Sequence, residues 1–187
     1  HQESAIYSSD KDLKLKKIHG KDLSYNNYGD IFACLSLSKI LPKNRGVIIV
    51  KHSNPTGVSI ESNHLKSYIS AMNGDPVSAF GGIVLCNFKL NSKVTKEIIK
   101  KYYEIIIANG FDRTSLRMLK NKKDLRVIDS SKFILSKKNK IISGLNSFLM
   151  QTRDDQIFNK QNCKVVSKVK PSNKVMEQLI FSLNVCR

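Results

Sequence analysis

The sequence predicts an α/β fold, in which a layered sheet carries helices on both faces. Short runs of β-branched residues alternate along the chain with longer stretches whose apolar residues recur at helical spacing. Clusters of asparagine, glycine and proline separate these segments, as expected for turns between strands and helices. The 187 residues suffice for one domain or slightly more, and a hydrophobic content of 41% is enough for a buried core.

The first half of the chain contains the clearest strand signal. Val47 to Val50 are four β-branched residues in a row, which favours a buried strand, and Asn54-Pro55-Thr56-Gly57 reads as the turn that follows it. Alternating leucines and charges predict an edge strand at 11–17. Residues 26–30 are expected to form a loop in which Asp30 caps the next helix. Helices are predicted at 31–41, 61–72 and 94–103.

Further strands and helices are predicted along the rest of the chain. Apolar runs indicate short buried strands at 83–86, 105–108 and 125–128. Strands joined by Ser143-Gly144 are expected between residues 132 and 153. The remaining expected elements are a helix at 113–121, a strand at 164–169, and a last helix at 173–185 capped by Ser172 or Asn173.

The charge and the cysteines limit the classes of function. A net charge of +17 favours an anionic partner, but only six of the 32 basic residues are arginine, the preferred reader of bases. Aromatic residues do not interleave with the lysines, so nucleic-acid binding is not expected. No apolar stretch approaches the ~18 residues that a membrane span needs. Four scattered cysteines without a Cys-x-x-Cys pair fit a reducing cytoplasm.

Lys51 and His52 form the most informative pair, because a cation and an imidazole lie side by side at the end of a predicted buried strand. One interpretation is a general base beside an electrostatic stabiliser; the other is a solvated lysine and a capping histidine at an ordinary strand end. Loops in which small polar residues lie beside a buried strand or a helix start also occur at 24–30, 75–82 and 104–112. In an α/β sheet such loops can converge at one edge.

Two other loops carry candidate binding residues. Gly81 and Gly82 permit close approach of the backbone to a ligand, and Phe80 between small residues is either a wall for a ring or a core residue. Glu104 precedes a buried strand. A carboxylate there either binds an amine or amide of a ligand or is an ordinary exposed residue beside the strand.

Four segments taken together are more specific than any one of them, and in order and spacing they resemble the AICAR transformylase family. The resemblance runs over essentially the whole chain. The segments are His1-Gln2, 20–30 (Gly-Lys-Asp-Leu-Ser-Tyr-Asn-Asn-Tyr-Gly-Asp), 50–58 (Val-Lys-His-Ser-Asn-Pro-Thr-Gly-Val) and 75–84 (Asp-Pro-Val-Ser-Ala-Phe-Gly-Gly-Ile-Val).

The resemblance implies formyl transfer from 10-formyltetrahydrofolate, a co-substrate, to the 5-amino group of AICAR in IMP biosynthesis. It implies a cytidine-deaminase-like sheet, with a first subdomain at 1–160 and the start of a similar unit at 161–187. The active sites would lie at a homodimer interface, and the chemistry would need no metal. The protein would be cytoplasmic. The family's motifs imply a catalytic pair, Lys51 and His52, and substrate-binding residues Asn27, Phe80, Gly81 and Glu104.

The chemistry of this transfer suits those residues. The AICAR amine is a poor nucleophile, so its attack on the formyl carbon needs a proton acceptor, and His52 can serve near neutral pH. Lys51 can stabilise the resulting oxyanion, or keep His52 neutral by like-charge repulsion. Lysine-rich surroundings also suit a ribotide phosphate and a folate glutamate tail.

Several features depart from the family or leave rival interpretations. The family continues on both sides of this chain, through an Arg-Tyr-Gly-Glu-Asn-Pro segment and a Lys-Ser-Asn segment, so we expect an internal fragment that is inactive alone. Thr56 stands where bacterial members often have cysteine. The main rival is a non-catalytic basic module of the same fold that binds nucleic acid. A deaminase is rejected because no Cys-x-x-Cys pair is present to bind zinc.

Overall fold

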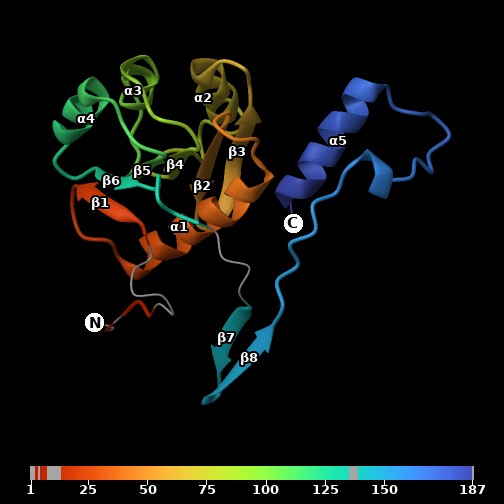
Figure 1. Ribbon diagram of the computed structural model, residues 1–187, viewed down its shortest axis with the longest axis horizontal. Helices are drawn as coiled ribbons and strands as arrows, with labels where there is room; N and C mark the ends of the chain where they lie inside the picture. Colours follow the sequence, from red (N-terminus) through yellow and green to blue (C-terminus); the bar gives the residue numbers. More distant parts are fainter. Residues whose placement is uncertain (1–2, 4, 8–13, 135–138, 187) are drawn as a thin grey trace. The chain divides into compact units, whose positions relative to one another are not determined.

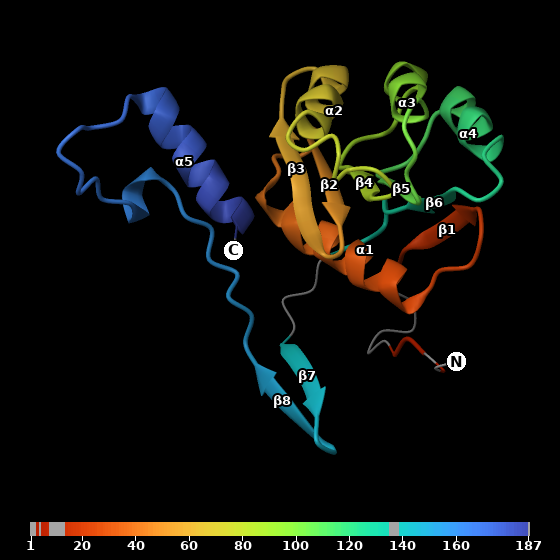
Figure 2. The same ribbon diagram turned by 180° about the vertical axis from the view of Figure 1, so that it is seen from behind.

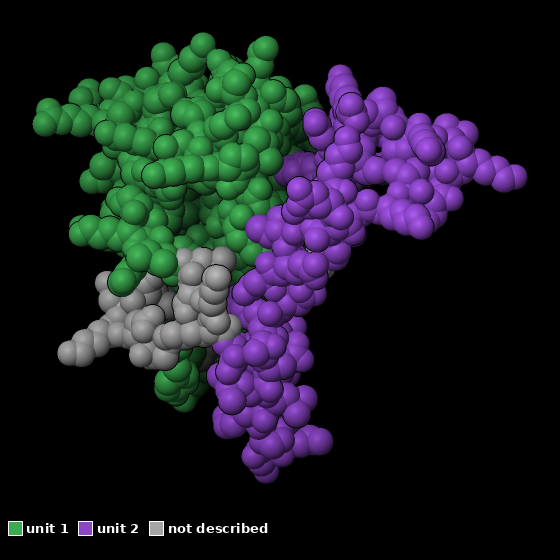
Figure 3. Space-filling model, turned by 45° about the vertical axis from the view of Figure 1, so that its right-hand side comes forward, with its two compact units in different colours: residues 1–134 green, residues 135–187 purple. Residues whose placement is uncertain are grey.

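The computed structural model describes residues 3, 5–7, 14–134 and 139–186, so the His1-Gln2 segment lies outside the described residues. The chain divides into two compact units, residues 1–134 and 135–187, which Figure 3 colours separately. This division falls before the subdomain boundary expected after residue 160. The assignment of two cytidine-deaminase-like subdomains stays a prediction.

A six-stranded mixed sheet forms the centre of the first unit, in the order β1-β6-β5-β4-β2-β3. Strands β4, β5 and β6 are parallel, whereas β2 is antiparallel to both β3 and β4, and β1 is antiparallel to β6. The end of β2 therefore lies at the edge where β4, β5 and β6 begin. The strands are β1 (Lys16–His19), β2 (Gly46–Lys51), β3 (Asn54–Ile60), β4 (Ile83–Cys86), β5 (Ile105–Ala108) and β6 (Arg126–Asp129).

Helices cover both faces of this sheet, as Figures 1 and 2 show from opposite sides. Alternate strand residues point to opposite faces: Ile49 and Val84 pack with α2–α4, and Ile48 and Leu85 pack with α1. The predicted α/β fold with helices on both faces is thus confirmed. The helices are α1 (Tyr25–Leu37), α2 (His64–Met72), α3 (Ser92–Ile98) and α4 (Arg113–Lys120), and a short 3₁₀ turn (Ser38–Ile40) follows α1.

The first helix begins earlier than predicted, so the expected loop at 26–30 is wrong. Ser24 is the N-cap: its hydroxyl accepts from the Asn27 amide, and the Asn27 side chain accepts from the Ser24 amide. This capping box satisfies the first free amides of the helix and lets an asparagine- and glycine-containing stretch be helical. Asp30 lies inside the helix and does not cap it.

The turn predicted at 54–57 is also wrong, because β3 begins at Asn54. The reversal occurs at His52 and Ser53, whose φ angles of 52° and 61° are both left-handed. Pro55 is tolerated because β3 is an edge strand and because the register shifts opposite Ile49 and Val50, where a bulge accommodates the extra residue.

Smaller differences concern element ends. The 11–17 strand is β1, displaced to Lys16–His19, and residues 11–13 lie outside the described residues. Asparagine caps set the true starts of two helices: Asn63 begins α2 later than predicted, and Asn91 begins α3 earlier. The α3 helix also ends at Ile98, well before the predicted residue 103.

The second unit contains a hairpin and a helix. Strands β7 (Lys140–Gly144) and β8 (Ser147–Gln151) pair antiparallel, and the turn lies at Leu145-Asn146 rather than at Ser143-Gly144. The strand predicted at 164–169 is wrong, because these residues have no strand conformation in the described part of the chain. Apart from Lys168, they line an apolar groove with α5 (Asn173–Cys186). The expected capping by Ser172 is confirmed, since its hydroxyl accepts from the Val175 amide at 3.3 Å.

Candidate active site

Three of the four candidate loops, 24–30, 51–57 and 75–82, meet at one edge of the sheet. Val50 is paired with Ile83, and Ile83 with Ile105, so the end of β2 lies beside the starts of β4 and β5. The 75–82 loop leads into β4, and Glu104 directly precedes β5. The fourth loop, 104–112, contributes only Glu104 to this edge, because β5 carries its other residues to the opposite edge.

Lys51 connects the end of β2 to the small-residue loop. Its half-buried side chain donates from Nζ to the Gly81 carbonyl oxygen at 2.9 Å. Gly81 has a φ of +69°, and a Cβ built there would lie 3.0 Å from the Lys51 Nζ. Gly81 also donates its amide to the Tyr102 carbonyl oxygen at 2.9 Å. The backbone at Gly81 thus leaves space for the ammonium group and fixes its position.

His52 follows directly, at the exposed tip of the β2–β3 hairpin. Its carbonyl oxygen accepts from the Asn54 side chain at 2.8 Å, and the next amide, of Ser53, donates to Oδ1 of Asp30 at 2.6 Å. Helix α1 therefore holds the turn that carries His52. Asp30 was expected only as a helix cap, and this contact was missed. Its spacing of three residues from Asn27, on one helix face, is the signal that could have found it.

Asn27 and Glu104 are brought together from residues far apart in the chain. Nδ2 of Asn27 donates to Oε2 of Glu104 at 3.1 Å, and the asparagine is only 6% exposed. The Ser24 amide donates to Oδ1 of Asn27 at 3.2 Å, which fixes which end of the side-chain amide faces the carboxylate. One oxygen of Glu104 is thereby held, in a half-buried position.

Phe80 lies at the surface and not in the core, with 67% of it exposed. Its ring packs against Tyr102, with the two centroids 5.2 Å apart. Tyr102, also exposed, was missed by the sequence interpretation, which singled out only the neighbouring Glu104. The pair is an accessible aromatic surface next to Gly81, and such surfaces suit planar ligands.

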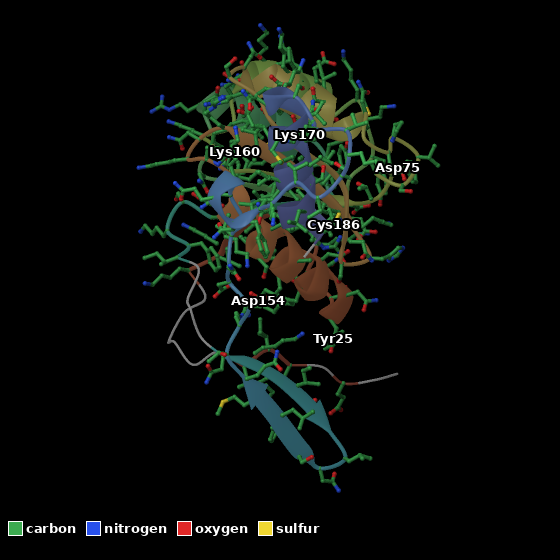
Figure 4. The ribbon with its side chains drawn as sticks, turned by 90° about the vertical axis from the view of Figure 1, so that its right-hand side faces the viewer. Tyr25, Asp75, Asp154, Lys160, Lys170 and Cys186 are labelled. Carbon is green, nitrogen blue, oxygen red and sulfur yellow. The ribbon has the colours of Figure 1, made fainter. Side chains whose placement is uncertain are left out.

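Asp75 opens the small-residue loop, and its carboxylate organises the turn. Oδ1 accepts from the Ser78 amide at 2.9 Å. Hydrogen bonds from the Ser78 hydroxyl and amide hold the pKa of Asp75 below its ordinary value. Figure 4 labels Asp75 on the loop after α2 and Tyr25 at the start of α1. The turn interpretation of Asp75 thus fits its contacts.

A basic cavity of about 660 Å³ opens beside Glu104 and Tyr102. Lys21 on its wall forms an ion pair with Asp124 at 3.1 Å. A cavity with this excess of positive charge suits a ligand with phosphate or carboxylate groups. The other positively charged residues that line the cavity are Lys100, Lys101, Lys122, Lys123 and Arg126.

Neither a metal cluster nor a membrane span is found in the described part of the chain. Within residues 3, 5–7, 14–134 and 139–186, no three His, Cys, Asp or Glu side chains are grouped so that they could hold a metal ion. Over the same residues, no helix is both long and apolar enough to cross a bilayer.

Comparison with known proteins gives the chain a family. Relatives called bifunctional purine biosynthesis protein PurH are 36% identical in Thermoanaerobacter sp. (strain X514), 37% in Buchnera aphidicola subsp. Schizaphis graminum (strain Sg) and 35% in Aquifex aeolicus (strain VF5). Each match covers 100% of this chain and 37% of the relative, so the chain spans little more than a third of their length. The model of the AICARFT/IMPCHase bienzyme family matches residues 1–187, and the chain therefore belongs to that family.

Proposed function

We propose that this chain supplies Lys51 and His52 to an enzyme that transfers the formyl group of 10-formyltetrahydrofolate to the 5-amino group of AICAR. One observation carries the proposal: the end of β2, the Gly81 loop and the Asn27–Glu104 pair lie at one edge of the sheet in a member of the AICARFT/IMPCHase family. The relatives are named for purine biosynthesis, which this reaction serves.

The reaction needs a proton acceptor and a stabilised oxyanion. The amine nitrogen forms a bond to the formyl carbon, the carbonyl electrons move to oxygen, and His52 accepts the proton that the amine loses. Collapse of this intermediate breaks the bond between the formyl carbon and N10 of the folate, and N10 regains a proton. The exposed position of His52 at a hairpin tip is compatible with this role, since both substrates must reach it.

Lys51 is the proposed stabiliser of the oxyanion. Its ammonium carries three N–H donors, and only one is needed for the bond to the Gly81 carbonyl oxygen at 2.9 Å. The remaining donors can face a negative oxygen next to His52. A charge fixed in advance by this bond needs little reorganisation when the oxyanion forms.

The other residues are proposed to bind the substrates. Glu104, held by Asn27 through one oxygen, has its second oxygen for an amine or amide of AICAR. Phe80 and Gly81 would line the AICAR and folate sites. The proposed partners are these two small molecules and a second copy of the chain, in the cytoplasm, rather than nucleic acid or a membrane.

The test is His52→Ala in the protein at its natural length. We expect the turnover number for formyl transfer to fall by about 10²–10⁴-fold, the usual effect of losing a general base, while AICAR binding measured by calorimetry changes little. His64→Ala is the matched control, because His64 starts α2 beyond the end of β3, at the opposite edge of the sheet. Turnover that survives in His52→Ala would refute the assignment.

A further inference from the structure

Helix α1 contacts two separate parts of the candidate site. Asn27 holds Glu104, and Asp30, three residues later, holds the hairpin turn. Oδ1 of Asp30 accepts from the Ser53 amide at 2.6 Å and from the Ser53 hydroxyl at 3.3 Å. Residues three apart lie on the same face of a helix, so one rigid element fixes both parts of the site.

The turn depends on this contact because its local sequence does not favour its conformation. His52 and Ser53 both have left-handed φ angles, 52° and 61°. Two-residue hairpin turns of this kind normally use Asn-Gly, since glycine has no Cβ to clash in the left-handed region. Neither residue here is glycine. The turn is held by the Asn54–His52 hydrogen bond within the hairpin and by the Asp30–Ser53 hydrogen bond from α1.

We propose that Asp30 is a positioning residue for His52. Its carboxylate, half-buried on α1, binds the amide that directly follows His52 and so restricts the backbone from which the imidazole projects. Hydrogen bonds between a carboxylate and a backbone N–H are shorter and stronger than neutral ones. This inference rests on the proposed function, in which His52 is the proton acceptor.

Asp30 has no competing task at the start of its helix. Ser24 is the N-cap, and the capping box with Asn27 is complete without Asp30. The turn packs directly on α1, since a Cβ built at Gly29, next to Asp30, would lie at ordinary contact distance, 3.6 Å, from the Ser53 hydroxyl oxygen. The carboxylate of Asp30 therefore has no capping role and lies against the turn that it binds.

The experiment compares three variants in the protein at its natural length. In Asp30→Ala we expect kcat to fall about 10–100-fold, as misplacement of a reacting group by about 1 Å can cause, with KM for both substrates within about threefold. Asp30→Asn keeps an oxygen acceptor for the Ser53 amide and should keep most of the turnover. Adding Ser53→Gly to Asp30→Ala should restore part of kcat, because glycine adopts the left-handed conformation readily.

Amide hydrogen exchange without substrate tests the contact independently of activity. The Ser53 amide should exchange at least about tenfold faster in Asp30→Ala than in the wild type, and Asp30→Asn should remain close to the wild type. Unchanged exchange in Asp30→Ala would overturn the inference, and so would an unchanged kcat despite faster exchange. Equal losses of kcat in Asp30→Asn and Asp30→Ala would also overturn it, because they would indicate a role of the charge itself.

The same data separate the inference from the proposed function. If His52→Ala keeps its turnover while the Ser53 amide still responds to Asp30→Ala, the proposed function fails and the catalytic role of Asp30 fails with it. If His52→Ala loses turnover and Asp30→Ala changes neither kcat nor exchange, only the inference about Asp30 fails.

Discussion

The two edges of the six-stranded sheet carry different polar chemistry. One edge carries three ionisable residues: Lys51 and Glu104 are half-buried, and His52 is exposed. At the other edge, where β4, β5 and β6 end, polar groups bind one another: Asn109 donates to the Asn87 carbonyl oxygen at 2.9 Å, and Ser130 donates to the Asn109 side-chain oxygen at 2.9 Å. The first edge presents charged groups at the surface, whereas the polar groups of the second edge are hydrogen-bonded to one another.

This difference shows why a general rule has to be applied strand by strand. In open α/β sheets, ligands bind beyond the carboxyl ends of the parallel strands, and that rule would select the Asn87–Asn109 edge. Because β2 is antiparallel to β4, the carboxyl end of β2 lies at the amino ends of β4, β5 and β6. The Lys51–His52 pair marks the end of its own strand correctly, yet it lies at the other edge of the sheet.

Lys51→Met tests whether the Lys51 edge carries the chemistry, because it keeps an unbranched side chain and removes the ammonium. We expect kcat for formyl transfer to fall about 10²–10³-fold, the usual loss when a donor to an oxyanion is removed. Steady-state kinetics of the protein at its natural length would measure it.

Lys89→Met is the matched control for Lys51→Met. Lys89 is exposed and follows β4 at the opposite edge. Its loss should leave kcat unchanged within about twofold, since an exposed charge at that distance is screened by solvent and salt. Similar losses in both variants would show that general basicity, rather than the Lys51 edge, supports the reaction.

A change at the opposite edge should affect stability instead of turnover. Asn87 is 9% exposed; its side chain accepts from the Gly46 amide and donates to the Pro42 carbonyl oxygen, both at 2.7 Å. Asn87→Ala leaves both backbone groups without these partners, so we expect the free energy of unfolding to fall by about 2–4 kcal/mol. Urea unfolding of the 187-residue chain would measure this.

Asn121→Ala provides the comparison for Asn87→Ala. Asn121 is exposed at the C-terminal end of α4, so its replacement should change the free energy of unfolding by no more than about 0.5 kcal/mol. A loss of kcat in Asn87→Ala, measured on the folded fraction, would contradict the division of roles between the two edges.

The central strands could be predicted because their sequences allow few alternatives. Val47 to Val50 are β-branched and fully buried, as a run of this kind requires in a sheet covered on both faces. The edge strand β3 could not be predicted, because its Pro55 is acceptable only where a strand has an unpaired side and a register shift. The sequence therefore indicates the central strand β2 clearly, whereas the edge strand β3 becomes recognisable only in the structure.

The candidate site shows the same contrast between local and long-range information. Lys51 and His52 are adjacent in the chain, so the sequence alone was enough to single out the pair. The contacts that build the rest of the site are visible only in the structure: Asp30 and Ser53 are 23 residues apart, and Asn27 and Glu104 are 77 apart. These contacts depend on how α1 packs against the sheet, which no local pattern specifies.

The smallest effect is expected at Asp112, on the side of the sheet that carries no candidate catalytic group. Asp112 caps α4; its Oδ1 accepts from the Ser115 amide at 2.6 Å and its Oδ2 from the Ser92 amide at 3.0 Å. These contacts, that of the Ser115 amide foremost, hold its pKa below the ordinary value. Asp112→Ala should therefore lower the free energy of unfolding by about 1 kcal/mol at pH 7.

The sign of the pH dependence follows from the lowered pKa of Asp112. A carboxyl group with a lower pKa in the folded state stabilises the fold above its unfolded pKa, about 3.9, and that contribution is lost as the pH falls through the folded pKa. The difference between wild type and Asp112→Ala should thus shrink below about pH 4 in urea unfolding experiments. Asp112→Asn, which keeps an oxygen acceptor, should lie between them at pH 7. A difference that is equal at pH 7 and pH 3 would mean that the charge of Asp112 does not contribute, and that this edge is held by neutral hydrogen bonds alone.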